Sequence, residues 1–249
     1  MPAARVAGIF CFFYKEITIS KKLLVIGGVA AGASFAARAR RLCEDAQITI
    51  VERGPDVSFA NCGLPYFVGG EIVSRDALAV QTPATLKGML NLDVQTRCEA
   101  LRIDRVGKRV EVRHLDRDET EWLSYDKLML APGAAPLRPD LPGIDDPRIY
   151  VLRNLQDMDR IAAAVASGMR AVVIGAGFIG LEMAEQLRHR EISVQLVELQ
   201  NQVFPQLDAP MVKLIESELH HHGIGITLGD GVAKFEPVGE FVRCHLSSG

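Results

Sequence analysis

The chain lacks paired cysteines, long apolar runs and a strong charge of either sign, and each absence excludes a class of protein. Its five cysteines are scattered and odd in number, with no C-x-x-C pair. That pattern argues against a secreted disulfide framework and a four-ligand zinc site, and it fits a reducing cytoplasm. No apolar stretch approaches the roughly 18 residues of a membrane-spanning helix. The net charge of -3 gives no reason to expect nucleic acid or an anionic membrane as partner.

The length and composition are those of a globular protein with two domains. Hydrophobic residues make up 48% and charged residues 24% of the chain, which is a normal balance for a globular protein. Its 249 residues are more than one domain usually contains. The folded part is expected to begin at Lys21. Residues 1–20 are predicted to be a disordered extension or translated sequence upstream of the true start. They make a poor signal peptide, because no small-residue cleavage site follows the apolar stretch 8–14.

The same local pattern occurs twice along the chain. Residues 22–26 and 47–51 are short, apolar and β-branched, which is typical of buried strands, and helix formers fill 30–43 between them. The pattern returns later as a strand at 170–174, a helix at 178–190 and a strand at 193–197 that leads to Glu198. The sequence therefore predicts an α/β protein with two Rossmann-like dinucleotide-binding domains.

Further elements are expected between and after these units. Thr82 followed by Pro83 predicts the start of a helix. Alternating polar and apolar residues predict antiparallel strands or strand edges at 94–103, 108–115 and 120–130. A helix near 210–222 is expected to stop at Gly223, and short strands are expected at 224–228, 232–236 and 241–247. Consecutive residues on a helix point about 100° apart, so His220, His221 and His222 are interpreted as a polar helix end rather than a metal site.

Residues 175–180 (GAGFIG) form a complete G-x-G-x-x-G motif between a strand and a helix. The first glycine permits a tight turn, the second lets backbone approach a pyrophosphate, and the third allows close helix–strand packing. The helix N-terminus adds partial positive charge. Glu198 lies 198 − 175 = 23 residues after Gly175, where a carboxylate binds ribose hydroxyls and repels a 2′-phosphate. NADH is therefore favoured over NADPH.

The earlier turn at 27–32 (GGVAAG) departs from the motif, because Val29 occupies the middle glycine position. Glu52 follows at the end of the next strand and supports a nucleotide role. Two such turns predict two cofactors, which is the layout of enzymes that pass hydride from a nicotinamide to a flavin. The alternative, that both turns serve packing alone, requires two coincidences.

One cysteine lies just after the first unit, in residues 58–66 (SFANCGLPY). Asn61 is an acceptable N-cap and Pro65 is tolerated in a first helical turn, so we expect Cys62 at a helix N-terminus with a lowered pKa. Most cysteines are inert core residues, but the position of Cys62 beside a nucleotide-binding unit favours a reactive role.

Residues 58–66 resemble the single-cysteine motif of coenzyme A disulfide reductases and their relatives with a rhodanese domain, which reduce CoA persulfides and polysulfides. The first turn, with Val29 where other proteins have glycine, also resembles that group. So do residues 131–134 (APGA), 152–155 (LRNL) and 177–183 (GFIGLEM). The resemblance runs from about Lys22 to the last residue and is most specific around Cys62.

This resemblance implies that the first turn binds FAD, that the second binds NADH or NADPH, and that electrons reach Cys62 through the flavin. The cysteine would form a mixed disulfide with CoA or take a persulfide sulfur. Ser58 and Asn61 would line the sulfur site. Arg41 would match an arginine that contacts a CoA phosphate, and Arg38 falls at another CoA contact, although both suit a solvated helix face equally well.

The resemblance also assigns the cofactor contacts residue by residue. Glu182 would lie near the nicotinamide and flavin, with a helix-surface acid as the equal alternative. The positions implied for FAD are Gly27, Val29, Ala30, Gly32, Glu52, Arg53, Ala131, Pro132 and Gly133. Those implied for NAD(P)H are Gly175, Gly177, Phe178, Ile179, Gly180, Glu182 and Glu198.

Two residues discriminate among relatives of that group. Glutathione-type reductases carry a second cysteine where this chain has Phe67, and NADH peroxidases and oxidases carry a histidine where it has Ala30. A disulfide or persulfide substrate is therefore favoured over peroxide or oxygen. Two alternatives stay open: an NADH oxidase or peroxidase that uses a cysteine sulfenic acid, and a nucleotide-binding fragment without turnover.

The resemblance finally implies an FAD domain at 21–150 and an NAD(P)H domain at 151–249, both incomplete. The family's later Gly-Asp motif and its dimerisation domain do not occur in these residues. The complete protein is therefore expected to be a homodimer assembled through a C-terminal domain.

Overall fold

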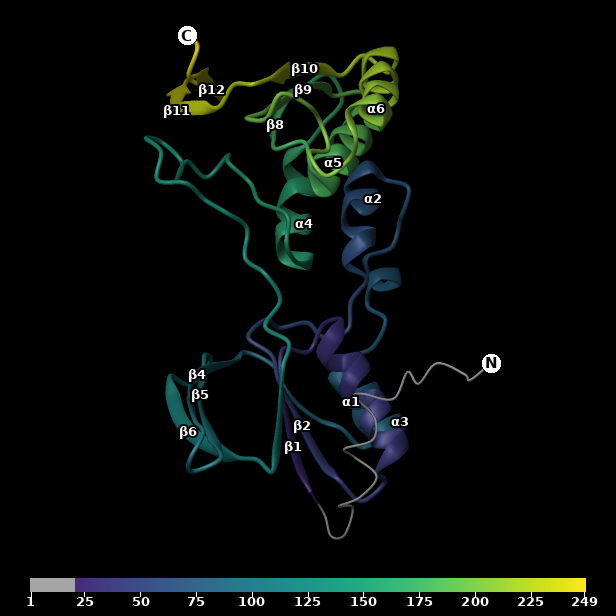
Figure 1. Cartoon of the computed structure of the whole chain (residues 1–249), viewed down its shortest axis with the longest axis vertical. Helices are drawn as coiled ribbons and strands as arrows, with labels where there is room; N and C mark the ends of the chain where they lie inside the picture. The colour runs from purple at the N-terminus through teal and green to yellow at the C-terminus, as the bar shows by residue number, and fades with distance from the viewer. Residues whose placement is uncertain (1–20) are drawn as a thin grey trace, which may run out of the picture. The chain divides into compact units, whose positions relative to one another are not determined.

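The computed structural model describes residues 21–249, so the expectation for residues 1–20 lies outside the described residues. The chain divides into two compact units (Figure 1). The first unit holds the described residues up to Phe59 together with Ala79–Ala134, and the second holds Ala60–Leu78 together with Ala135–Gly249. No helix within residues 21–249 is both long and apolar enough to cross a membrane.

The first unit is built on a four-stranded parallel sheet with the order β3-β2-β1-β7. The predicted strands at 22–26 and 47–51 are confirmed as β1 and β2, which lie side by side in parallel. Parallel strands covered on both faces are apolar throughout, which explains their unbroken hydrophobic sequence. The four strands are β1 (Lys22–Ile26), β2 (Gln47–Val51), β3 (Asp93–Gln95) and β7 (Lys127–Leu130).

The two faces of this sheet bury alternate residues of the same strands. On one face Val25 and Ile50 pack with Ala36 of α1 (Ala31–Leu42) and Leu86 of α3 (Pro83–Leu90). On the other face Leu24 and Val51 pack against the antiparallel sheet of β4 (Cys98–Asp104), β5 (Arg109–His114) and β6 (Glu119–Ser124). Figure 1 shows the two helices and the antiparallel sheet on opposite sides of β1 and β2. Burial of each large aliphatic side chain contributes about 1.5–3 kcal/mol.

Two predicted antiparallel strands are wrong, because each is two strands in different sheets. The stretch 94–103 breaks at Arg97, whose φ of 51° is left-handed, so β3 joins the parallel sheet and β4 the antiparallel one. The stretch 120–130 breaks after Ser124, and Asp126 then bonds to Lys22 just before β7, which lies beside β1. Alternation of polar and apolar residues does not reveal which sheet a strand joins.

The second unit repeats the strand–helix–strand pattern. Its parallel sheet has the order β10-β9-β8, formed by β8 (Arg170–Ile174), β9 (Ser193–Glu198) and β10 (Gly225–Leu228). Helix α5 (Phe178–His189) connects β8 to β9, and α6 (Ala209–His221) leads to Gly223 with φ +71°. The antiparallel pair β11 (Val232–Val238) and β12 (Phe241–Leu246) ends the chain. Among residues 21–249, β8 pairs only with β9.

The second unit also contains helices close to the cysteine motif. A 3-10 turn (Asn61–Gly63) leads directly into α2 (Leu64–Gly69), and a second 3-10 turn follows at Arg75–Leu78. Helix α4 (Leu155–Ala164) was not predicted. It begins where the Asn154 side chain accepts a hydrogen bond of 2.8 Å from the backbone N–H of Asp157, which is a normal N-cap.

Candidate functional site: two dinucleotide turns and an exposed cysteine

The two glycine turns have the same backbone geometry. Gly27 and Gly175 adopt φ angles of +93° and +94°, which favour glycine. The N–H of Gly27 donates to the carbonyl of Val51, and the N–H of Gly175 donates to the carbonyl of Val197, each at 2.8 Å. Both turns are therefore tied in the same way to the end of the neighbouring strand.

The last glycine of each turn packs on the first one. A Cβ at Gly32 would lie 1.8 Å from the carbonyl oxygen of Gly27, and a Cβ at Gly180 would lie 1.8 Å from that of Gly175. A larger residue at either place must displace the turn. This is the close helix–strand packing that the motif predicts.

A carboxylate closes each turn from the next strand. Glu52 accepts hydrogen bonds from the N–H groups of Gly28 at 2.7 Å and Gly54 at 2.8 Å. Glu198 accepts from Ala176 at 2.7 Å and from Gln200 at 2.9 Å, and it is only 9% exposed. Because an ionised carboxylate has about four acceptor positions, each acid keeps capacity for the hydroxyls of a ribose.

The helices that follow the turns present unfilled N-termini. Neither Ala30 before α1 nor Gly177 before α5 makes a side-chain cap, and neither helix has an acid in its first turn. Their free N–H groups and positive dipole ends suit the oxygens of a pyrophosphate. A Cβ at Gly177 would meet no atom within 4 Å, so a ligand has room to approach this backbone. Both turns fit a dinucleotide.

The predicted segment 131–133 lies against the first turn. A Cβ at Gly27 would meet the carbonyl oxygen of Ala131 at 1.9 Å, and the N–H of Ala131 donates to Ile26 at 2.7 Å. Pro132 follows, and Gly133 has φ +70°. Ser58 also belongs here, because its N–H donates to Gly28 at 3.0 Å and its φ is 45°.

Two predicted cofactor residues of the first unit have different surroundings. Val29 is partly buried within the turn. Arg53 follows Glu52 directly, and its side chain is 72% exposed and forms an ion pair of 3.6 Å with Glu99. The guanidinium of Arg53 is therefore engaged with the antiparallel sheet.

Cys62 lies in the 3-10 turn that precedes α2, in the second unit, and it is exposed. The prediction that Asn61 caps the helix is wrong. Asn61 is itself inside the 3-10 turn, Ala60 precedes that turn, and no side chain makes a cap there. Helix α2 starts after Gly63, with Pro65 in its first turn as predicted.

Cys62 is the accessible thiol among the described cysteines. Cys98 is buried, and Cys43 and Cys244 are partly buried. Burial raises the pKa of both Cys98 and Cys244, which disfavours their thiolates at neutral pH. The exposed position therefore distinguishes Cys62 from the other three as a nucleophile.

Acidic side chains gather beside the helix that follows Cys62. The pKa of Tyr66 is raised chiefly by the negative charge of Glu182, then by burial and by Glu185, Glu71 and Cys62. The phenol therefore stays protonated at neutral pH. Glu182, predicted near the nicotinamide, thus lies close to α2. Tyr66 was missed, although its place four residues after Cys62 puts it one helical turn away.

An aromatic pair stands at the start of α5. The Phe178 ring, 64% exposed, meets the Phe204 ring edge-on with the ring centroids 4.2 Å apart. The N–H of Phe204 donates to Ala176 at 2.8 Å, which ties its loop to the glycine turn. Ile179 is also exposed, at 59%. Phe204 was missed because no motif includes it.

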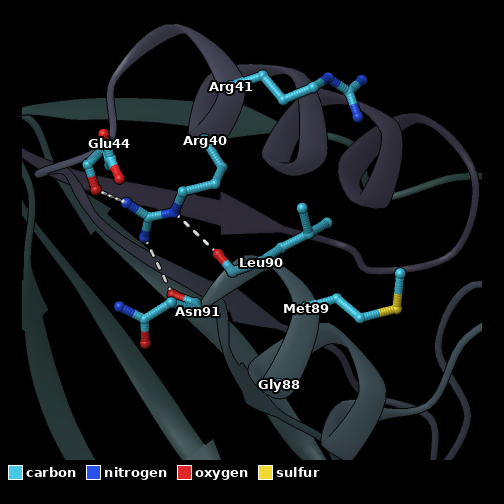
Figure 2. A pocket seen from close by; sticks show the side chains of 7 residues that line it. All are labelled: Arg40, Arg41, Glu44, Gly88, Met89, Leu90 and Asn91. Carbon is cyan, nitrogen blue, oxygen red and sulfur yellow. Dashed lines mark hydrogen bonds between the residues drawn. The ribbon is translucent and has the colours of Figure 1, made fainter.

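A depression of about 450 Å³ lies between the ends of α1 and α3 in the first unit (Figure 2). Arg40 joins these ends by donating to the carbonyls of Leu90 at 2.8 Å and Asn91 at 3.0 Å. Arg41 also lines the depression, and Figure 2 shows its side chain pointing away from the Arg40 network. Arg38 lies three residues earlier on α1 and is exposed.

The family model described as pyridine nucleotide-disulphide oxidoreductase matches residues 21–249. The chain belongs to this family. Its members are oxidoreductases that bind FAD together with NADH or NADPH, and the two turns described above match that pair of cofactors. Within residues 21–249, no group of three or more potential metal ligands occurs.

Two solved structures and one curated relative are among the most similar proteins. A coenzyme A disulfide reductase of Staphylococcus haemolyticus is 36% identical over 216 residues, which are 86% of this chain and 48% of the relative. Reduced Bacillus anthracis CoADR-RHD is 44% identical with a TM-score of 0.88, covering 93% of this chain and 42% of that one. An NAD-dependent persulfide reductase from A. fulgidus is 37% identical with a TM-score of 0.86, covering 92% and 43%. The chain spans about half the length of such relatives.

NADH oxidases are also similar. The water-forming NADH oxidase of Lactobacillus brevis, bound to NADH, is 31% identical with a TM-score of 0.86, covering 92% of this chain and 51% of that one. An engineered form bound to NADPH is described as a water-forming NADPH oxidase. Its five substitutions fall at a glycine, at an aspartate 18 residues later, at the two residues after that aspartate, and at a proline 7 residues beyond it.

Proposed function

We propose that this chain is part of an NAD(P)H-dependent flavoprotein that reduces CoA disulfide or CoA persulfide through Cys62. The observation that carries the proposal is one exposed cysteine among the described residues, in a chain with two closed dinucleotide turns. The similarity to proteins named coenzyme A disulfide reductase and persulfide reductase supports the same substrate class.

Each turn has its own cofactor in this proposal. The first turn, Glu52 and the segment 131–133 would hold FAD, and the second turn and Glu198 would hold the nicotinamide dinucleotide. Bound FAD would supply the two-electron chemistry that links a nicotinamide hydride to sulfur. The residues of the chain bind and orient the cofactors. The free N–H groups at the starts of α1 and α5 would donate hydrogen bonds to the pyrophosphate oxygens, and the two glutamates fix the turns.

Glu198 is proposed to select NADH. The substitutions of the engineered NADPH oxidase have a spacing that leads in this chain from Gly180 to Glu198 (198 − 180 = 18), then to Leu199 and Gln200, and to Pro205 (205 − 198 = 7). The acid removed in that oxidase thus matches Glu198 in position and charge. A carboxylate there repels the 2′-phosphate of NADPH.

The proposed reaction at Cys62 has two steps. The Cys62 thiolate attacks one sulfur of CoA disulfide, the sulfur–sulfur bond breaks, and one CoA thiolate leaves as the mixed disulfide forms. Two electrons from NADH then cleave the mixed disulfide, releasing the second CoA and regenerating the Cys62 thiolate. With a persulfide, the terminal sulfur transfers to Cys62 and leaves as sulfide on reduction. Phe67 stands where an internal cysteine partner would be, so the sulfur partner comes from the substrate.

The substrate's phosphates are proposed to meet Arg41. Its guanidinium lines the depression at the end of α1 and makes no hydrogen bond or ion pair within the described part of the chain. Arg40, in contrast, is committed to backbone carbonyls. Arg41 therefore keeps its donors for an anion, and Arg38 would add a second cation on the same helix.

The second candidate is an NADH oxidase that cycles Cys62 through a sulfenic acid. It is favoured by the similarity to the Lactobacillus brevis oxidase and opposed by Ala30 in the first turn. The test measures NADH consumption by the full-length protein with CoA disulfide under nitrogen, and with oxygen alone. CoA-disulfide-dependent oxidation that Cys62→Ser abolishes supports the reductase. Steady oxygen consumption with no response to CoA disulfide supports the oxidase.

A further inference from the structure

The C-terminal end of α2, the helix that follows Cys62, is held by side chains of α5 and of Arg190 directly after it. The guanidinium of Arg190, just after α5, donates to the carbonyl of Val68 at 3.2 Å. Nδ1 of His189 lies 3.3 Å from the carbonyl oxygen of Gly69, and Nε2 of Gln186 donates to the Glu71 carboxylate at 2.8 Å. All of these residues belong to the second unit.

These contacts supply hydrogen-bond donors to carbonyl groups that a helix cannot pair by itself. The last carbonyls of a helix have no partner within it. In α2 the carbonyl of Tyr66 accepts from Glu71 at 3.0 Å and that of Phe67 accepts from Gly70 at 3.1 Å. The next two carbonyls, of Val68 and Gly69, are the ones that Arg190 and His189 reach. A cationic side chain at a helix C-terminus also opposes the negative end of its dipole.

Gln186 determines how closely α2 packs against α5. Its side chain is 1% exposed, and its Oε1 lies so close that a Cβ on Gly69 would meet it at 1.8 Å. That oxygen has no hydrogen-bond partner within the described residues. A buried acceptor without a partner lowers the stability of the folded state. Only a residue without a side chain at position 69 allows this approach of α2 to α5.

We propose that Gln186, His189 and Arg190 are positioning residues. They fix the Cys62 segment, residues 60–78, to α5, the helix that follows the second glycine turn. The proposal rests on the function proposed above for Cys62. An ion pair between Arg75 and Asp159 of α4, at 3.0 Å, holds the far end of the same segment. Cys62 therefore belongs to the unit that contains the second glycine turn, although it follows the first glycine turn in the sequence.

The test compares hydrogen exchange and Cys62 alkylation in Gln186→Leu, Arg190→Ala and Arg190→Lys. The control is Arg188→Ala: Arg188 lies on α5 but donates to His222 at 3.1 Å and Ile192 at 2.9 Å, not to α2. In Gln186→Leu and Arg190→Ala, amides 66–72 should exchange about tenfold faster, the size expected for losing a hydrogen bond to a charged group. The iodoacetamide rate of Cys62, followed as a function of pH, should rise severalfold at each pH.

Arg190→Lys should restore both rates, and Arg188→Ala should change neither. Equal exchange of amides 66–72 in wild type, Gln186→Leu and Arg190→Ala would overturn the proposal. If Arg190→Ala unfolds the second unit, Gly69→Ala is the test, since its Cβ pushes on Gln186 and should loosen the same amides. Exchange is read without turnover, so the proposal is decided even if Cys62→Ser keeps activity and the proposed function fails.

Discussion

Glu198 accepts a hydrogen bond of 2.7 Å from the backbone N–H of Ala176, the second residue of the glycine turn. One carboxylate thereby closes the turn, and in the proposed function the same carboxylate would bind a ribose. The turn at Gly27 repeats this arrangement, with Glu52 bonded to Gly28 at 2.7 Å. Each acid therefore has two roles that can be separated by mutation.

Glu198→Gln should weaken NADH binding while it shifts preference toward NADPH. The amide oxygen can still accept from Ala176, so the contact with the glycine turn is kept. The hydrogen bond from Gln200 and the negative charge that repels a 2′-phosphate are lost. We expect a loss of about tenfold in NADH affinity and a gain for NADPH, since a neutral acceptor lowers the worth of a hydrogen bond from about 1.5–3 to about 0.5–1.5 kcal/mol. Binding titrations with both dinucleotides measure the two effects. Unchanged discrimination would contradict the assignment of Glu198.

Gly27→Ala should destabilise the protein more than Gly175→Ala. Both glycines have a positive φ near +94°, which costs an alanine about 1–2 kcal/mol. Only at Gly27 would the added Cβ also meet a backbone atom, the Ala131 oxygen at 1.9 Å, whereas at Gly175 it meets nothing within 4 Å. Urea unfolding of the two variants gives the comparison, and equal losses in the free energy of unfolding would count against the described packing.

Much of the fold follows from local sequence, and the failures have physical causes. The strands on both sides of each turn were predicted to the residue or nearly so, because buried parallel strands are continuously apolar. Arg97 was not recognised as a break, since a left-handed φ in a non-glycine residue leaves no sequence signal. Helix α4 was missed although Asn154 and Asp157 form a readable N-cap.

The candidate site was predictable only where it is local. The turn residues, Glu52 and Glu198 follow from motif spacing, and the structure gives both acids the same hydrogen bonds. The approach of Gln186 to Gly69 and of Phe204 to Phe178 joins residues far apart in sequence. Such contacts depend on tertiary packing, so no spacing rule indicates them.

Asp146 and Arg148 should make the second unit sensitive to acid. Hydrogen bonds from Arg148 lower the pKa of Asp146 from 3.8 to about 2, and the same guanidinium donates to Gly239 at 3.0 Å and to Phe241 at 3.1 Å. A lowered pKa adds stability above pH 3.8 that is lost as the pH falls toward 2. Unfolding measured from pH 6 to pH 2 should show a shallower loss in Asp146→Asn. Identical slopes for both proteins would contradict this coupling.

Cys62 should be alkylated before the other described cysteines. It is exposed, whereas Cys98 is buried and burial raises the pKa of Cys98 and Cys244. Native protein treated briefly with iodoacetamide at neutral pH should carry label at Cys62 and little at Cys98, as read by peptide mass mapping. In urea the labelling should even out, which serves as the control for access. Preferential labelling of Cys98 in native protein would be inconsistent with the structure.

The most direct test of the account is the mass of the protein after exposure to CoA disulfide. The account predicts one CoA adduct per chain, located on Cys62 by peptide mapping, removed by reductant and absent from Cys62→Ser. Labelling of another cysteine, or an adduct of equal yield in Cys62→Ser, would contradict the claim that Cys62 forms the mixed disulfide.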